Sequence, residues 1–165
     1  MRFSFSKVKM RFFAAFLLVF LSYFVCASEL NNPTLYIKNE NGEIVFKRAL
    51  EKNGVFGIVF THSVAKTPVY EWFYQTDQKV ALSHTIYQDF GAGLPHEIAS
   101  PQTMTIENGF IRIDGFTLQM DVLPIRVGRI ANHQLLLPTN AKNAPEKIAL
   151  DTLAKAGSAL FLSYQ

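Results

Sequence analysis

Cysteine is almost missing from this sequence, and acidic residues are missing from its beginning. The only cysteine, Cys26, lies in an N-terminal apolar run, and every charged side chain in the first 27 residues is basic. A basic segment followed by an apolar run (residues 12–27) and small residues is typical of a secretory signal peptide. The run is shorter than the roughly 20 residues that a helix needs to cross the hydrocarbon core of a membrane. The sequence therefore predicts an exported, periplasmic protein.

The end of the apolar run predicts where the signal peptide is removed. The side chains of residues 25–27 are small or modest in size, which favours cleavage after Ala27. Two alternatives remain. The apolar run could stay uncleaved as a membrane anchor, or Cys26 could carry a lipid, although residues 23–25 are bulky for a lipid-attachment motif. The predicted domains are a signal peptide (residues 1–27) and one β-rich domain (residues 28–165).

Removal of the leader excludes several classes of function. The mature chain then has no cysteine, hence no disulfide, no thiol nucleophile and no thiolate metal site. The leader takes four of the 16 basic residues and none of the 13 acidic ones, so the net charge changes from +3 to about −1. With that charge and no basic stripe, no binding to nucleic acid is expected. About 138 residues suffice for one compact domain that buries roughly two thirds of its unfolded surface.

The mature chain is a succession of short segments in which apolar and polar residues alternate. Turn signals such as Asn108-Gly109 and Asp114-Gly115 separate them. Near the end, Asp151 is expected to cap a helical turn over residues 152–156, closed by Gly157. The pattern predicts an all-β fold: a single antiparallel β-sandwich or barrel-like domain with one short helical turn near the C-terminus. The expected strands are residues 34–39, 43–48, 55–64, 68–76, 80–88, 103–107, 110–113, 116–122, 125–130, 133–137 and 158–164.

The densest polar cluster contains His62, Ser63 and Glu71. A hydrolase reading is disfavoured because adjacent strand residues point to opposite faces, so His62 is badly placed as a base for Ser63. If the two strands form a hairpin, His62 and Glu71 could meet across it. Three interpretations stay open: a structural pair, a binding site for a polar ligand or partner, and a catalytic pair.

A metal site is a weaker alternative. His62 and His84 with Glu71 could hold a metal ion with an open coordination position, but none of the four histidines has the spacing of a zinc motif. No cofactor and no catalytic residue is therefore expected. The glycines of the long loop, Gly91 and Gly93, permit either a packed turn or a rim that closes on a ligand or partner.

Three short motifs resemble domain-of-unknown-function family 1850. They are Phe60-Thr61-His62-Ser63-Val64, Lys66-Thr67-Pro68-Val69-Tyr70-Glu71 and Phe90-Gly91-Ala92-Gly93-Leu94-Pro95. The resemblance covers roughly residues 55–137. His62, Ser63, Glu71, Gly91 and Gly93 all lie in the family's motifs.

The resemblance implies a small exported protein without an established activity, associated with TAXI-type tripartite ATP-independent periplasmic (TRAP) transporters. The mature chain is too short for a two-lobed solute-binding protein and has no bundle of apolar helices for a permease. We therefore expect a non-enzymatic accessory protein that contacts the TRAP permease or the TAXI solute-binding protein. The alternative is a stand-alone periplasmic domain that binds a small ligand, and a hydrolase or metal-binding enzyme ranks below both.

Overall fold

A computed structural model describes residues 32–51, 53–88, 97–139 and 144–165. Almost all of them belong to one compact unit, Pro33–Gln165. The predicted signal peptide with its cleavage after Ala27, and the loop glycines Gly91 and Gly93, lie outside the described residues. Within the described part of the chain, no helix has the length and apolar character needed to span a membrane.

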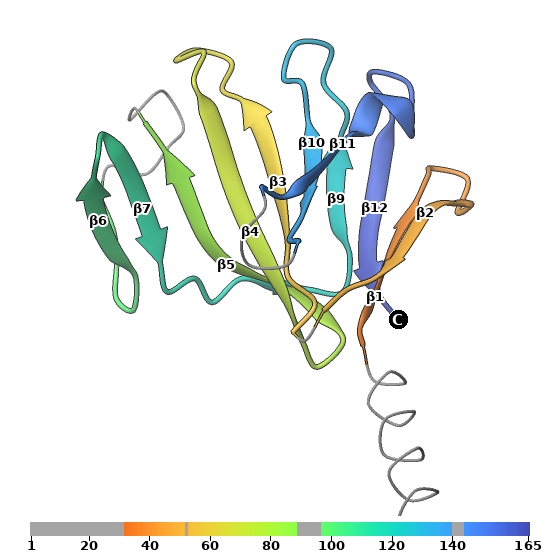
Figure 1. Ribbon diagram of the computed structural model, residues 1–165, viewed down its shortest axis with the longest axis horizontal. Coiled ribbons are helices and arrows are strands. Elements are labelled where there is room, and N and C mark those ends of the chain that lie inside the picture. Colours follow the sequence, from red (N-terminus) through yellow and green to blue (C-terminus); the bar gives the residue numbers. More distant parts are fainter. Residues whose placement is uncertain (1–31, 52, 89–96, 140–143) are drawn as a thin grey trace, which may run out of the picture. The chain divides into compact units, whose positions relative to one another are not determined.

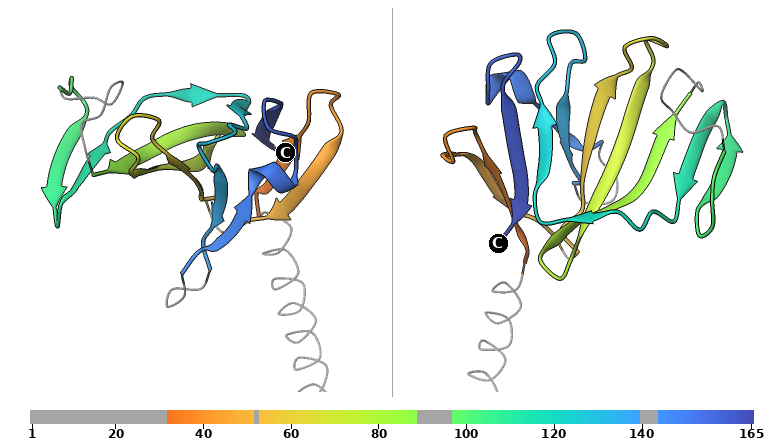
Figure 2. Two further views of the ribbon diagram at one scale, coloured as in Figure 1. Left: turned by 90° about the horizontal axis from the view of Figure 1, so that it is seen from above. Right: turned by 180° about the vertical axis from the view of Figure 1, so that it is seen from behind.

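Four strands form the smaller antiparallel sheet, in the order β2-β1-β12-β9. The first and last strands of the unit pair directly, with Leu35 opposite Tyr164. Figure 2 shows these two segments, orange and dark blue, side by side. The strands of this sheet are β1 (Thr34–Lys38), β2 (Ile44–Ala49), β9 (Leu123–Arg126) and β12 (Ala159–Tyr164).

The larger antiparallel sheet has the order β11-β10-β3-β4-β5-β7-β6 (Figure 1). The short strand β8 pairs with one end of β5. Its long central strands β3, β4 and β5 are consecutive in the chain and form two hairpins. The strands of this sheet are β3 (Phe56–Thr61), β4 (Pro68–Thr76), β5 (Lys79–Tyr87), β6 (Thr103–Glu107), β7 (Phe110–Asp114), β8 (Gln119–Met120), β10 (Gln134–Leu137) and β11 (Glu146–Ala149).

Alternating side chains of both sheets meet in one hydrophobic core. In β1 and β12 every second residue is buried, which is the pattern expected when one face of a strand is covered. Phe56 of β3 stacks on Phe73 of β4 at 5.3 Å and packs against Tyr164 of β12 at 6.0 Å between ring centroids. The hydroxyl of Tyr164 donates a hydrogen bond to the carbonyl of Gly54. The predicted all-β, sandwich-like domain is therefore confirmed.

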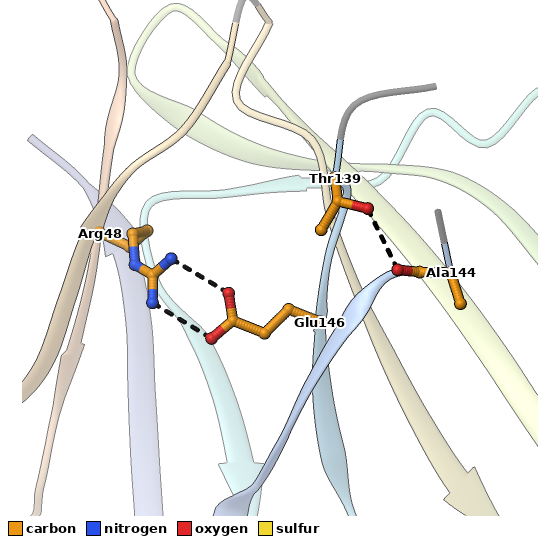
Figure 3. Close-up of polar contacts among 4 residues, drawn as sticks. All are labelled: Arg48, Thr139, Ala144 and Glu146. Atoms are coloured by element: carbon orange, nitrogen blue, oxygen red, sulfur yellow. Dashed lines mark hydrogen bonds and ion pairs between the residues drawn. The ribbon is translucent and has the colours of Figure 1, made fainter. Parts of the chain in front are cut away.

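An ion pair joins an edge strand of one sheet to an edge strand of the other. Arg48 of β2 donates two hydrogen bonds, of 3.1 and 3.2 Å, to the carboxylate of Glu146 in β11 (Figure 3). Near it, the hydroxyl of Thr139 donates to the carbonyl of Ala144 at 3.1 Å. Both charged side chains are more than 40% exposed (45% and 42%), so water screens the pair and its contribution is at most about 1 kcal/mol.

Four segments differ from the sequence expectation. The strand β11 was not expected, and the strand expected at residues 116–122 is reduced to the two residues of β8. The strand expected at residues 125–130 begins earlier and ends at Arg126, as β9. The helical turn is a 3₁₀ helix, η1 (Leu150–Thr152), and Asp151 lies inside it instead of capping it. The turn lies earlier than expected because Leu150 is completely buried in the core, which fixes its position. Gly157 does have the expected positive φ, 97°.

Candidate functional site

His62 lies just after β3 and holds the loop that leads to β4. Its ring Nδ1 accepts hydrogen bonds from the backbone N–H groups of Val64 (3.3 Å) and Ala65 (3.0 Å). Its backbone N–H donates to the carbonyl of Thr67, and its carbonyl accepts from Lys66. The residue is only 8% exposed. His62 therefore has a structural role in this loop, because its ring supplies the acceptor that two loop amides need.

Ser63 and Glu71 do not join His62 in one constellation. Ser63 is exposed in the same loop. Glu71 lies in β4 opposite Ile58, so the hairpin does not pair His62 with Glu71. The reason is that the pairing of β3 with β4 ends at Thr61 opposite Pro68, so His62 lies in the loop beyond the last pair. The other two residues of the predicted site, Gly91 and Gly93, are outside the described residues.

Glu71 faces a pocket between the two sheets. The pocket has a volume of about 210 Å³. Its walls come from β3 and β4 of the larger sheet, from β9 of the smaller sheet, and from His133 just before β10. The polar members of the lining are Glu71, Arg126 and His133, and the remaining members are apolar: Ile58, Phe60, Leu123, Pro124 and Ile125.

The carboxyl group of Glu71 is poorly solvated and has no partner within the described residues. Burial raises its pKa above the ordinary value, because an apolar environment disfavours the charged form. Thr85 of β5 lies directly opposite Glu71 on the same face of the sheet. Its hydroxyl is buried and makes no hydrogen bond to any described residue. Burying a carboxylate without a partner is costly, so a ligand that supplied a partner to Glu71 would be stabilised here.

His133 and Arg126 are held in place by backbone groups. The Nδ1 atom of His133 accepts from the N–H of Gly128 at 3.3 Å, and its ring lies 5.4 Å from that of Phe60. Burial lowers the pKa of His133, which favours the neutral ring with its proton on Nε2 as a donor. Arg126 donates from Nη1 to the carbonyl of Gly157 at 2.7 Å. The pocket thus combines an acceptor or weak acid with a neutral imidazole. Arg126 is exposed on β9 while its neighbour Ile125 is buried, so its guanidinium points to the outer face of the strand.

His84 does not contribute to this site. It lies opposite Trp72 in the β4–β5 pair, and Trp72 points to the face of the sheet that is opposite to Glu71 because neighbouring strand residues alternate. Among the residues that the structure describes, no three His, Cys, Asp or Glu side chains come together as a metal site would require. The metal ligands suggested by the sequence, His62, His84 and Glu71, are therefore not brought together.

Sequence reasoning found Glu71 but missed its two polar neighbours. Arg126 and His133 lie in two segments that the sequence predicts as apolar strands, and the histidine spacing gives no metal motif that would single out His133. The available signal was the position of each at a strand boundary: Arg126 is the last residue of β9, and His133 immediately precedes β10. A polar residue at the end of an apolar strand often lines the opening between two sheets, but only the packing of the sheets shows which ends meet.

A family model described as domain of unknown function (DUF1850) matches residues 56–142, more than half of the chain. The matched range contains the loop held by His62 and every residue that lines the pocket at Glu71. No curated protein and no solved structure matches the chain.

Proposed function

The chain belongs to the DUF1850 family, and from this premise we propose that it is a non-enzymatic, exported accessory protein of a TAXI-type TRAP transporter. The transporter association is the one that the family resemblance implies. The proposed partners are the membrane permease and the solute-binding protein of such a system. Its compartment is the periplasm, either free after removal of the leader or anchored by it.

One observation carries the proposal of a binding role: the partnerless carboxyl group of Glu71 in the pocket between the sheets. Ligand pockets are mostly apolar clefts with a few convergent polar groups, and the five apolar residues around Glu71, Arg126 and His133 fit that description. A carboxyl group and a neutral imidazole on one small pocket match a polar ligand that donates and accepts hydrogen bonds, such as an amino acid. Small organic acids fit as well, because a protonated Glu71 and the Nε2 atom of His133 would donate to their carboxylate.

The arrangement at His62 supports binding over hydrolysis. A general base needs a ring nitrogen directed at a nucleophile, whereas the Nδ1 atom of His62 accepts from two loop amides. Ser63, the adjacent hydroxyl, is exposed on the loop. The residues that form the pocket lie elsewhere, on β3, β4, β9 and the start of β10.

The accessory role is tested by retention and uptake. The tagged full-length protein is expected to co-purify with the cognate permease or solute-binding protein, and deletion of its gene is expected to reduce solute uptake. Complementation with Glu71→Gln, which keeps the shape of the side chain, should restore less uptake than the wild type. Complementation with Ser63→Ala, an exposed change outside the pocket, should restore it fully. Unchanged uptake on deletion together with no retained partner would contradict the proposal.

A second candidate function is favoured by the same pocket: a stand-alone periplasmic domain that binds a small ligand. It predicts that an amino acid or organic acid raises the unfolding temperature of the purified protein, because a ligand that binds only the folded state stabilises it by about 2.7 kcal/mol at 100 times its dissociation constant. Glu71→Gln should abolish that shift. A ligand-dependent shift combined with normal uptake after deletion would select this function over the accessory role.

A further inference from the structure

The opposite face of the larger sheet carries a groove that the proposed function does not use. Along β4, Tyr70 and Trp72 point away from the face that carries Glu71. The groove there has a volume of about 530 Å³, within the range of small-molecule sites. Its apolar lining is mainly aromatic: Tyr70, Trp72, Ile86 and Phe110.

The indole of Trp72 is held flat on the sheet. Gly57 of β3 lies directly opposite Trp72. A Cβ atom at Gly57 would lie 3.1–3.2 Å from three atoms of the six-membered ring, Cε3, Cδ2 and Cζ3. Because the three distances are almost equal, the ring presents its face to Gly57. On the β5 side the ring of His84 lies nearly parallel to it, at 19° and 6.2 Å between centroids. Trp72 is also one of the residues that line the groove.

The rim of the groove offers both donors and acceptors, with little net charge. Arg112 donates from Nε and Nη2 to Asp114, at 2.7 and 2.6 Å, so its orientation is fixed and its charge is compensated. Glu107 and Asn108, at the β6–β7 turn, add a carboxylate that only accepts and an amide that donates and accepts.

We propose that this groove binds a neutral saccharide, with one sugar ring stacked on the outward face of Trp72. A pyranose has a C–H face that packs on an aromatic ring and an edge of hydroxyl groups that donate and accept. Those hydroxyls would donate to Glu107 and accept from Arg112 and Asn108. An anion is disfavoured because Asp114 already compensates the charge of Arg112 and Glu107 adds a negative one. A proline-rich peptide is disfavoured because it presents carbonyl acceptors but few N–H donors for Glu107.

The sole tryptophan of the chain is the reporter for this site. Trp72 is the only tryptophan, so its fluorescence in the full-length protein responds to a ligand stacked on it. Titration with maltose, cellobiose, trehalose and N,N′-diacetylchitobiose is expected to give a saturable change with at least one of them. Glu107→Ala should weaken that binding by about tenfold, the effect of losing one hydrogen bond to a charged group. Asp121→Ala, which removes an exposed carboxylate outside the groove, should leave it unchanged.

Several results would overturn the inference. They are no saturable change with any of the four sugars, equal affinity for wild type and Glu107→Ala, or saturable binding only of a decaproline peptide or of citrate. A change in emission that follows protein concentration without sugar would indicate self-association instead, and would also refute it. Glu71→Gln keeps the groove intact, so undiminished sugar binding by this variant would show that the groove acts independently of the pocket between the sheets.

Discussion

At the scale of single residues, the carboxyl group of Glu71 links the pocket to solution pH. Burial raises its pKa above the value of about 4.5 that applies to the unfolded chain. The folded state therefore holds this proton more tightly than the unfolded state does. The contribution of Glu71 to the free energy of unfolding is fully present below the pKa of this group in the unfolded chain. It declines as pH rises through the pKa of the group in the folded protein.

Glu71→Gln removes this titration, which gives a prediction with a defined sign. The variant should gain stability relative to the wild type as pH rises from about 4 to about 8, by about 1.4 kcal/mol for each unit by which the folded pKa exceeds the unfolded one. The measurement is urea-induced unfolding of both proteins, without ligand, at several pH values. The other titratable groups are common to both proteins and largely cancel. A stability difference that does not change with pH would contradict the raised pKa.

His62 supports a second residue-scale prediction. His62→Ala removes the acceptor for the amides of Val64 and Ala65 and leaves a gap where a buried ring was. We expect a loss of about 1–3 kcal/mol in the free energy of unfolding. Ser63→Ala, at the exposed neighbouring position, should change it by less than about 0.5 kcal/mol. Chemical denaturation of the two variants measures the difference, and equal stabilities would mean that the ring does not hold the loop.

At the scale of elements, local chemistry made some strands and turns predictable from the sequence. Asn108 and Gly109 both have positive φ, 51° and 77°, and connect β6 to β7 as the Asn-Gly pair predicts. Glu71 is predicted as a site residue because it belongs to the polar cluster with His62 and Ser63, although the structure does not bring these three side chains together. Arg126 and His133 lie more than 50 positions further along. The packing of β9 against β3 and β4 brings Arg126 to the pocket, and the pairing of β10 with β3 brings His133 there.

The missed and misjudged strands depend on pairing between distant segments. In β11, Glu146 and Lys147 precede Ile148, so no apolar alternation is visible, and its pairing with β10 creates the strand. Residues 116–122 do alternate, yet Leu118 is 51% and Val122 41% exposed. Only Gln119 and Met120 pair with β5, because the other end of β5 pairs with β7. The alternation of apolar and polar residues alone cannot indicate which part of a neighbouring strand is still available for pairing.

The ion pair between β2 and β11 is the element-scale prediction. A double-mutant cycle of Arg48→Ala and Glu146→Ala should give a coupling free energy of about 0.5 kcal/mol, because both side chains are well exposed. The coupling should decrease further in about 1 M salt, where the Debye length is only about 3 Å. Thermodynamic unfolding of the four proteins gives the value. A coupling of several kcal/mol would mean that this contact, and not the shared core, holds the two sheets together.

At the scale of the whole molecule, β4 contributes side chains to two separate sites, because successive side chains of a strand point to opposite faces of the sheet. Glu71 faces the pocket between the sheets, while Trp72, the next residue, faces the groove on the other side. Moving β4 by one residue would exchange the two faces. The buried residues Val69 and Phe73, on the same face as Glu71, fix the register. Both sites therefore depend on the core that the two sheets build together.

That core extends beyond the segment that defines the family. Residues 56–142 contain β9 but not β1, β2 or β12, the other three strands of the smaller sheet. The missing strands supply a large part of the buried core: Leu35, Ile37, Leu160, Leu162 and Tyr164. Without them, one face of the larger sheet would expose its apolar side chains to water.

A fragment of residues 56–142 should therefore not fold by itself, whereas residues 33–165 should unfold cooperatively in urea. The expected signs in the fragment are the absence of near-ultraviolet circular dichroism, no sigmoidal transition, and Trp72 emission characteristic of a solvated indole. Adding a separate peptide of residues 143–165 should not restore the fold, since β12 pairs with β1 and β1 would still be missing. A cooperative transition in the fragment alone would mean that the larger sheet is stable without the smaller one. The pocket at Glu71 would then need only the walls that lie within the matched segment.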